Sequence, residues 1–245
     1  RAEAILPDTE KEYLAGFCLG LTTDTQDITG AVLMKREARV SLEQLEAACG
    51  KFRGDILQLP PMYSAVKKNG EKLYELARRG IEVERKPRPV RISRLEVRSF
   101  DSVSGKGSLV VSCSKGTYIR TLCHDIGNAL GCGGVMTSLR RTKASGFSLE
   151  GALTIGLARK LAAEEKLEEA LLPVEQLFLC YPELSVTEGQ TIRFQNGGAL
   201  ALDRLEVPGT AVEGSVFRVK SPSGGFVGLG CVDTADRQLK ILRLF

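Results

Sequence analysis

The feature that most constrains the fold is an amphipathic helix that directly follows a strand-like run. Its apolar residues recur at helical spacing, and Gly131 follows the last of them. These residues are Ile119, Leu122, Cys123, Ile126 and Leu130. The preceding residues 108–113 have the composition of a strand. A helix with a single apolar stripe must bury it against another layer, so the pattern predicts a domain in which helices cover a sheet.

Other segments add elements in an irregular order. Lys11 to Leu19 alternates apolar and polar residues, which predicts a strand. Ser41 to Gln44 is a capping-box pattern that opens a helix, and Lys72 to Arg79 predicts a short helix stopped by Gly80. Residues 154–172 predict a longer helix closed by Pro173. Because strands and helices do not alternate regularly, the fold class expected is α+β.

The residue pattern of the chain changes after about Leu179. Short runs of β-forming residues then alternate with Gly, Pro and Asn, as at residues 191–194, 216–219 and 226–229. This indicates a small, separate all-β unit. We therefore expect two domains, residues 1–178 and residues 179–245.

Positive charge is concentrated in one stretch. The net charge is only +4, yet residues 67–98 contain eleven Lys or Arg against five Asp or Glu, so this stretch carries +6 and the rest −2. A local basic stretch on a near-neutral chain is typical of a phosphate-binding surface, although a solvated charged surface gives the same pattern.

The cysteines and apolar runs limit the class of protein. Seven cysteines occur singly, and the chain has one histidine, so we expect no Cys/His zinc site or other metal centre. Most of the cysteines have apolar neighbours, which favours reduced core residues in a cytoplasmic protein. No apolar run approaches the roughly 18 residues that cross a bilayer, and no secretory signal is evident, so no membrane partner is expected.

Residues 114–120 carry the strongest chemical signal. A strand ends, a glycine turn follows, and a helix opens with Arg120 in its first turn. The helix dipole disfavours a cation there, so Arg120 is best explained by pairing with a carboxylate or phosphate. Tyr118 places an aromatic ring beside it, as recognition of a nucleobase requires. A surface arginine with a packed tyrosine remains the alternative.

Four ordered blocks extend this signal into a resemblance. They are K-x-Y at residues 11–13 with TTDTQD at 22–27, QLPPMYSAVK at 58–67 with LYELARRG at 73–80, KGTYIR at 115–120, and LRRTKASGF at 139–147. Together they resemble the bacterial-type TruB family of tRNA pseudouridine synthases over about residues 11–178. The resemblance implies a mixed, mainly antiparallel central sheet flanked by helices, the pseudouridine synthase fold.

The resemblance also implies the chemistry. The family isomerises uridine 55 in the T-loop of tRNA to its C-glycoside without a metal or cofactor, and the base must leave the stack to be reached. Tyr13 would stack on the flipped uracil near its C5. Arg120 would pair with the nucleophilic aspartate and keep it ionised, Tyr118 would shape the base pocket, and Leu139 would pack against the base. The partner expected is the T-stem-loop of tRNA, bound by a monomer.

The family's nucleophilic aspartate normally lies upstream, in a G-T-L-D-P-x-A-T-G motif that these 245 residues do not contain. Asp8, Asp24 and Asp27 belong to other segments and are not assigned the role. The sequence opens on Arg1, and residues 1–6 look like the end of a helix, so we expect a preceding segment to be missing and this chain alone to be inactive. A non-catalytic module that binds tRNA and aids its folding therefore remains the alternative function.

The remaining expectations concern RNA contact. By resemblance, five basic residues would meet phosphates, each being equally compatible with a plain solvated charge: Lys67, Arg78, Lys115, Arg140 and Arg141. The C-terminal unit more weakly resembles a PUA-like RNA-binding module, with a β appendage that only packs on the main domain as the alternative. His124, on the helix after Tyr118, is interpreted as structural.

Overall fold

The computed structural model describes residues 5–7 and 10–245. The chain divides into two compact units, one of residues 8–152 and one of residues 1–7 with 153–245. The expectation of a helix end at residues 1–6 falls mostly outside the described residues, as does Asp8.

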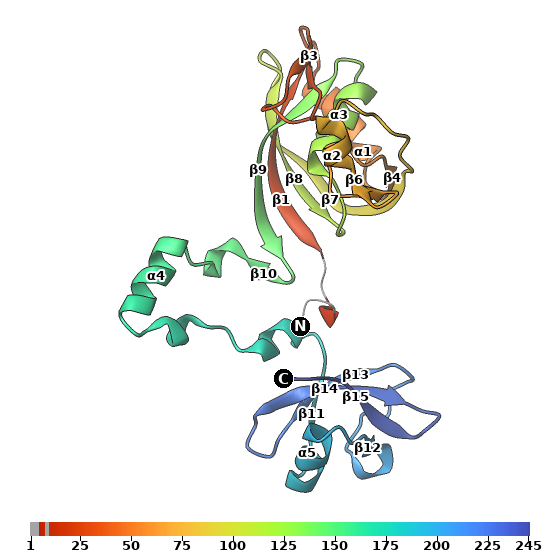
Figure 1. Cartoon of the computed structure of the whole chain (residues 1–245), viewed down its shortest axis with the longest axis vertical. Coiled ribbons are helices and arrows are strands. Elements are labelled where there is room, and N and C mark those ends of the chain that lie inside the picture. The colour runs from red at the N-terminus through yellow and green to blue at the C-terminus, as the bar shows by residue number, and fades with distance from the viewer. Residues whose placement is uncertain (1–4, 8–9) are drawn as a thin grey trace. The chain divides into compact units, whose positions relative to one another are not determined.

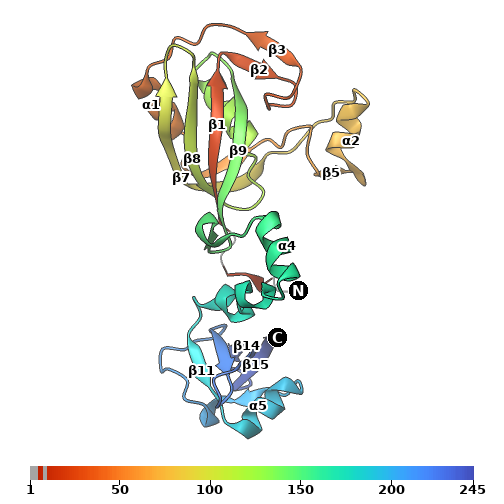
Figure 2. The same ribbon diagram turned by 90° about the vertical axis from the view of Figure 1, so that its left-hand side faces the viewer.

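The first unit is built on a six-stranded sheet with the strand order β10-β9-β1-β8-β7-β4 (Figures 1 and 2). All its described strand pairs are antiparallel. The strands of this unit are β1 (Lys11–Leu19), β2 (Leu21–Thr23), β3 (Val32–Lys35), β4 (Gly54–Gln58), β5 (Lys67–Lys68), β6 (Glu71–Lys72), β7 (Arg88–Asp101), β8 (Lys106–Cys113), β9 (Gly134–Ala144) and β10 (Phe147–Ser148). Its helices are α1 (Leu42–Gly50), α2 (Leu73–Arg78), α3 (Ile119–Ala129) and the 3₁₀ turn η2 (Leu149–Gly151).

The core of this unit lies between the sheet and helices α1 and α3 (Figure 1). The predicted stripe of α3 is buried, with Leu122 fully covered and Ile126 2% exposed. Strand β1 directs Ala15, Phe17 and Leu19 into the same core, as its alternation predicts. Helix α1 opens with the expected capping box, in which the Gln44 N–H donates to Ser41 Oγ and the Ser41 N–H donates to Gln44 Oε1.

Residues 59–87 form an arm between β4 and β7. The two-stranded β5–β6 ladder and α2 stand away from the main sheet (Figure 2). The predicted stop of α2 is confirmed, because Gly80 adopts a positive φ of 72° just after the helix. The basic stretch identified in the sequence, residues 67–98, therefore covers most of this arm and most of β7.

The second unit contains a five-stranded sheet with the order β11-β13-β14-β15-β12. The β11–β13 pair is parallel, and the other described pairs are antiparallel. The elements of this unit are α4 (Ile155–Ala163), η3 (Leu167–Ala170), η4 (Val174–Phe178), β11 (Glu183–Ser185), α5 (Glu188–Gln195), β12 (Leu200–Ala201), η5 (Leu202–Arg204), β13 (Val216–Lys220), β14 (Phe226–Asp233) and β15 (Gln238–Leu244). An α+β chain with a mainly antiparallel sheet and a C-terminal β unit is thus confirmed.

One predicted β run of this unit is wrong. Residues 191–194 lie inside helix α5, which opens at Thr187 with a complete capping box to Gln190. Thr191 and Phe194 are three positions apart and are both buried, so they fill one helical face against the sheet. The β-branched residues were misleading because tertiary packing outweighed their strand preference.

The helix predicted over residues 154–172 is also wrong beyond Ala163. Thr154 caps α4 as expected, but the helix ends at Glu164 and residues 164–173 contain only the short turn η3. Glu165 has a φ of 58°, and the N–H groups of Glu165 and Lys166 return to the carbonyls of Ala162 and Leu161. This is a Schellman termination without the usual glycine, so no glycine marks the end of the helix in the sequence.

Four of the seven cysteines, Cys49, Cys113, Cys123 and Cys132, are buried as expected, whereas Cys180 is exposed. All seven are free thiols, and burial raises the pKa of Cys49 to about 11 and that of Cys123 to about 12. Among the residues described, no cluster of His, Cys, Asp or Glu has the arrangement of a metal site. No helix in the same residues is long and apolar enough to cross a membrane.

Candidate active site

A pocket of about 240 Å³ opens in the first unit where β1, β9 and the start of α3 meet. It is several times larger than the roughly 30 Å³ of one water molecule. Its lining residues are Tyr13, Thr117, Tyr118, Ile119, Arg120, Met136 and Leu139. The three residues predicted to be catalytic and the predicted base-pocket residue therefore come together at one place, although they span 127 positions of the sequence.

Strand β1 brings Tyr13 to the pocket. Tyr13 lies opposite Val111 of β8 and Arg141 of β9, on the face that carries the buried Ala15 and Phe17. Ala15 and Phe17 are part of the buried core. The Tyr13 ring packs against the edge of this core and stays half-buried. Its position gives a ring that is held on one side and accessible on the other.

The start of α3 is shaped by the turn before it. Gly116 has a φ of 87°, and Thr117 Oγ1 donates to the carbonyl of Ser114, which closes the turn. Tyr118 then caps the helix without a side-chain cap of its own. Instead, its N–H donates to Gln58 Oε1 over 2.8 Å, and Gln58 Nε2 donates to its carbonyl over 3.1 Å.

Arg120 lies beside Tyr118 as predicted, with its guanidinium carbon 5.9 Å from the centre of the ring. Its Nη2 donates to the carbonyl of Tyr63. In the described part of the chain, no carboxylate lies within ion-pair distance of this guanidinium. The half-buried cation, placed against the helix dipole, therefore has capacity for an anion at the pocket.

Comparison with known families shows to which family the chain belongs. Residues 1–119 match "TruB family pseudouridylate synthase (N terminal domain)", and residues 120–179 match "tRNA pseudouridylate synthase B C-terminal domain". The chain belongs to the TruB family. The pocket lies across the junction of the two matched regions, since Tyr13 and Tyr118 fall in the first and Arg120 and Leu139 in the second.

Three relatives of this TruB-family chain are each named tRNA pseudouridine synthase B. The protein of Stutzerimonas stutzeri is 42% identical over 95% of this chain and 74% of its own length. That of Pseudomonas aeruginosa is 41% identical over 98% and 77%, and that of Alkaliphilus oremlandii is 42% identical over 98% and 79%.

Solved structures share the fold. A Cbf5-Nop10-Gar1 complex contains a chain that matches with a TM-score of 0.67 at 22% identity, over 99% of this chain and 67% of that one. An H/ACA RNP bound to a substrate RNA containing 2'-deoxyuridine matches with a TM-score of 0.66 at 20% identity, over 99% and 68%. At these identities the likeness concerns the fold alone.

The loop at residues 22–31 borders the pocket of this TruB-family chain without lending it a carboxylate. Asp24 accepts from the Ala31 N–H, and Asp27 accepts from the N–H and hydroxyl of Thr29. Both side chains are occupied in holding the loop, and neither lines the pocket.

The predicted basic residues fall into two groups. Lys115, Arg140 and Arg141 are exposed in the same region as the pocket, whereas Lys67 and Arg78 lie on the arm. In the register of β1 and β9, Arg141 lies opposite Tyr13 and Arg140 lies opposite Leu14. The two arginines therefore point to opposite faces of the sheet. Only Arg141 shares the face of the pocket.

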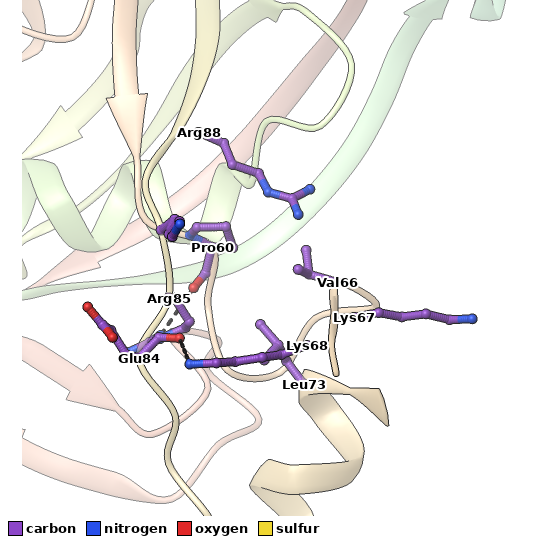
Figure 3. A pocket seen from close by; sticks show the side chains of 9 residues that line it. Pro60, Val66, Lys67, Lys68, Leu73, Glu84, Arg85 and Arg88 are labelled. Carbon is purple, nitrogen blue, oxygen red and sulfur yellow. Dashed lines mark hydrogen bonds between the residues drawn. The ribbon is translucent and has the colours of Figure 1, made fainter. Parts of the chain in front are cut away.

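The arm carries its own cavity of about 230 Å³, where cationic side chains surround apolar ones (Figure 3). Its cationic residues are Lys67, Lys68, Arg85, Lys86 and Arg88. Lys67 points outward and Lys68 is tied to the Glu84 carbonyl, while Arg88 points toward Val66 (Figure 3). Arg78 stacks on the ring of Tyr74, with 5.3 Å between the guanidinium carbon and the ring centre.

Sequence reasoning missed Met136 and Gln58. Met136 lies three positions before Leu139, a spacing at which strand residues normally face opposite ways. A bulge reconciles them, because Phe17 pairs with Met136 and Gly16 with Ser138, which leaves Thr137 as the extra residue. Gln58 was quoted only as part of a motif, and its contact lies 60 positions away along the chain.

Proposed function

We propose that this TruB-family protein is a tRNA pseudouridine synthase that isomerises uridine 55 in the T-loop of tRNA. The observation that carries the proposal is the convergence of Tyr13, Tyr118, Arg120 and Leu139 on one pocket. Family membership and relatives that bear this name across most of the chain support it.

The reaction conserves every atom of the nucleoside. The bond between N1 of uracil and C1′ of ribose breaks, the base turns, and a bond from C5 to C1′ forms. C5 loses its proton and N1 gains one, so no oxidant, metal or cofactor is required. The protein must hold an extruded base, supply a nucleophile and allow proton loss at C5.

Four of the seven lining residues then have a role in the proposal. The half-buried Tyr13 ring stacks on the uracil near C5, and Leu139 packs on the base from β9. Tyr118 forms the wall next to Arg120, and Arg120 pairs with the nucleophilic aspartate and holds it ionised. The 245 residues do not contain the family's G-T-L-D-P-x-A-T-G motif, and none of their aspartates is assigned the nucleophilic role.

RNA contacts are proposed on both units. Arg141 and Lys115 meet phosphates next to the pocket, and Lys67 and Arg78 meet them from the arm, whereas Arg140 faces away. The C-terminal residues 179–245 are proposed as a PUA-like RNA-binding domain. We further propose that the protein works as a monomer in the cytoplasm.

Release of tritium from tRNA labelled at C5 of uridine tests the function. The protein is expected to release label from a transcript with uridine 55 and none when only position 55 is changed to cytidine. Tight tRNA binding without any release would instead favour the binding-module alternative.

A further inference from the structure

Gln58 is a buried polar side chain that the mechanism does not use. It is the last residue of β4, at the edge of the sheet, and is only 2% exposed. Both functional ends of its amide bond the backbone of one residue, Tyr118, by accepting from its N–H and donating to its carbonyl. The side-chain amide thus makes the same two kinds of hydrogen bond with Tyr118 that the backbone of a neighbouring strand would make.

The bonds fix the point where the helix begins. Tyr118 has φ −97° and ψ 104°, so it is extended while the next residue is helical. Its carbonyl accepts from the Leu122 N–H as well as from Gln58, whereas its N–H donates to Gln58 and to no other group among the described residues. An apolar side chain at position 58 would leave that N–H without its partner.

A second contact joins the same two segments. The Arg120 guanidinium donates to the carbonyl of Tyr63, and Pro60 and Pro61 stiffen the chain between Gln58 and Tyr63. Residues 58–63 therefore hold Tyr118 through its backbone and Arg120 through its side chain. Both of these residues line the pocket.

We infer that Gln58 is a positioning residue of the active site. Its amide sets the direction in which Tyr118 leaves the turn, and through the adjacent first turn of α3 it sets the place of the Arg120 guanidinium. The inference rests on the proposed function, because the pocket is useful only if both groups are aligned on a base. A displacement of about 1 Å at such a site costs about 100-fold in rate.

The test uses two substitutions in the full-length protein. Gln58→Met keeps the shape and removes both bonds, and Gln58→Glu keeps an acceptor for the Tyr118 N–H but loses the donor to its carbonyl. We expect kcat for tritium release to fall about 10- to 100-fold in Gln58→Met, with an intermediate fall in Gln58→Glu. The Kd for tRNA should stay within about threefold, since neither bond faces the RNA.

Gln44→Met is the matched control. It also removes a glutamine side chain that bonds a backbone N–H at the start of a helix, that of Ser41 before α1. We expect it to lower the thermal midpoint and leave kcat unchanged. A Gln58→Met protein that is folded and turns over like this control would overturn the inference. Should Gln58→Met not fold, the decision passes to Gln58→Glu: a lowered kcat supports the inference, and wild-type kcat overturns it.

Amide hydrogen exchange separates this inference from the proposed function. The Tyr118 N–H should exchange faster in Gln58→Met than in the wild type and stay protected in Gln44→Met. Unchanged protection of Tyr118 in Gln58→Met would overturn the inference even where turnover falls. A wild type that releases no tritium overturns the proposed function, while the exchange experiment still reports whether Gln58 holds Tyr118.

Discussion

Two arginines, one in each unit, both donate to a tyrosine carbonyl but differ in their other partners. Arg120 donates to the carbonyl of Tyr63, and Arg218 of β13 donates to the carbonyl of Tyr181. Arg218 is 13% exposed and also pairs with Glu175, which in turn accepts from Lys220 over 2.7 Å. For Arg120, no such carboxylate is present among the described residues. Arg218 is therefore held in an ion pair within the second unit, whereas Arg120 lines a pocket of the first unit.

From this difference we expect Arg218 to be structural and Arg120 to be functional. A mostly covered charge is tolerated when it is paired and hydrogen-bonded, as Arg218 is. The Arg120 guanidinium donates to one carbonyl and lies beside one aromatic ring. These contacts use only part of its five N–H donors. We therefore expect changes at Arg120 to act on turnover and changes around Arg218 to act on stability.

The largest effect is expected for Arg120→Ala in the full-length protein. Loss of the guanidinium removes the group that we propose holds the nucleophile ionised, so kcat should fall on the order of 1,000-fold. The Kd for tRNA should change by less than about tenfold, roughly 1.4 kcal/mol. Filter binding and tritium release measure the two quantities. Lost binding with retained turnover would remove the proposed role.

Tyr13→Phe tests the aromatic side of the pocket. The ring keeps its stacking surface and loses its hydroxyl, so folding and tRNA binding should be retained while kcat falls about 100-fold, as for one lost proton transfer. The thermal midpoint checks folding, and single-turnover rates check chemistry. Near-normal turnover would show that the hydroxyl does not take part in proton transfer.

Glu175→Gln tests the paired arginine. The bonds from Lys220 and Arg218 hold the pKa of the Glu175 carboxyl below its usual range. A lowered pKa in the folded state adds stability above the unfolded value near 4.3, and this stability is lost as the pH falls through the folded pKa.

At pH 7 the variant should therefore lose about 1–3 kcal/mol of unfolding free energy in the second unit. Denaturant melts at several pH values measure this loss, which should shrink below about pH 4. A difference that is independent of pH would contradict the pairing, and turnover of the folded variant should match the wild type.

The smallest effect is expected for Arg78→Ala, which also serves as a control for charge loss at Arg120. Arg78 stacks on Tyr74 at the surface of the arm, so its removal should weaken tRNA binding a few-fold and lower the salt dependence of binding by about one phosphate contact. Binding isotherms at several salt concentrations measure both. A loss of turnover as large as that of Arg120→Ala would contradict the comparison.

The sequence predicted the elements whose signals are local. The alternation in β1, the stripe of α3 and the capping box of α1 all depend on neighbours within a few positions, and all three are confirmed. The motif resemblance also found four of the seven residues that line the pocket.

What the sequence did not predict depends on distant partners or rare backbone geometry. The helix at residues 188–195 packs on the second sheet, and Glu165 ends α4 in a conformation that glycine normally adopts. Met136 enters the pocket through a bulge in β9, and the Gln58–Tyr118 pairing joins β4 to α3. No periodicity within a short window contains that information.

Contacts of η4 bear on the design of shorter proteins. Phe178 is fully buried, and its ring centre lies 6.3 Å from that of Phe226 and 5.3 Å from that of Phe245. Together with the ion pairs of Glu175, this ties η4 to the β sheet of the second unit. A truncation made before Leu153 keeps these contacts together, whereas a cut after Phe178 separates them.

The most direct test of the central claim is a crystal structure of the full-length protein with a T-stem-loop RNA that contains 5-fluorouridine at position 55. We predict that the modified uracil is turned out of the stack and lies against Tyr13 and Leu139, with Arg120 facing a carboxylate beside it. RNA bound elsewhere on the protein, with this pocket empty or closed by side chains, would contradict it.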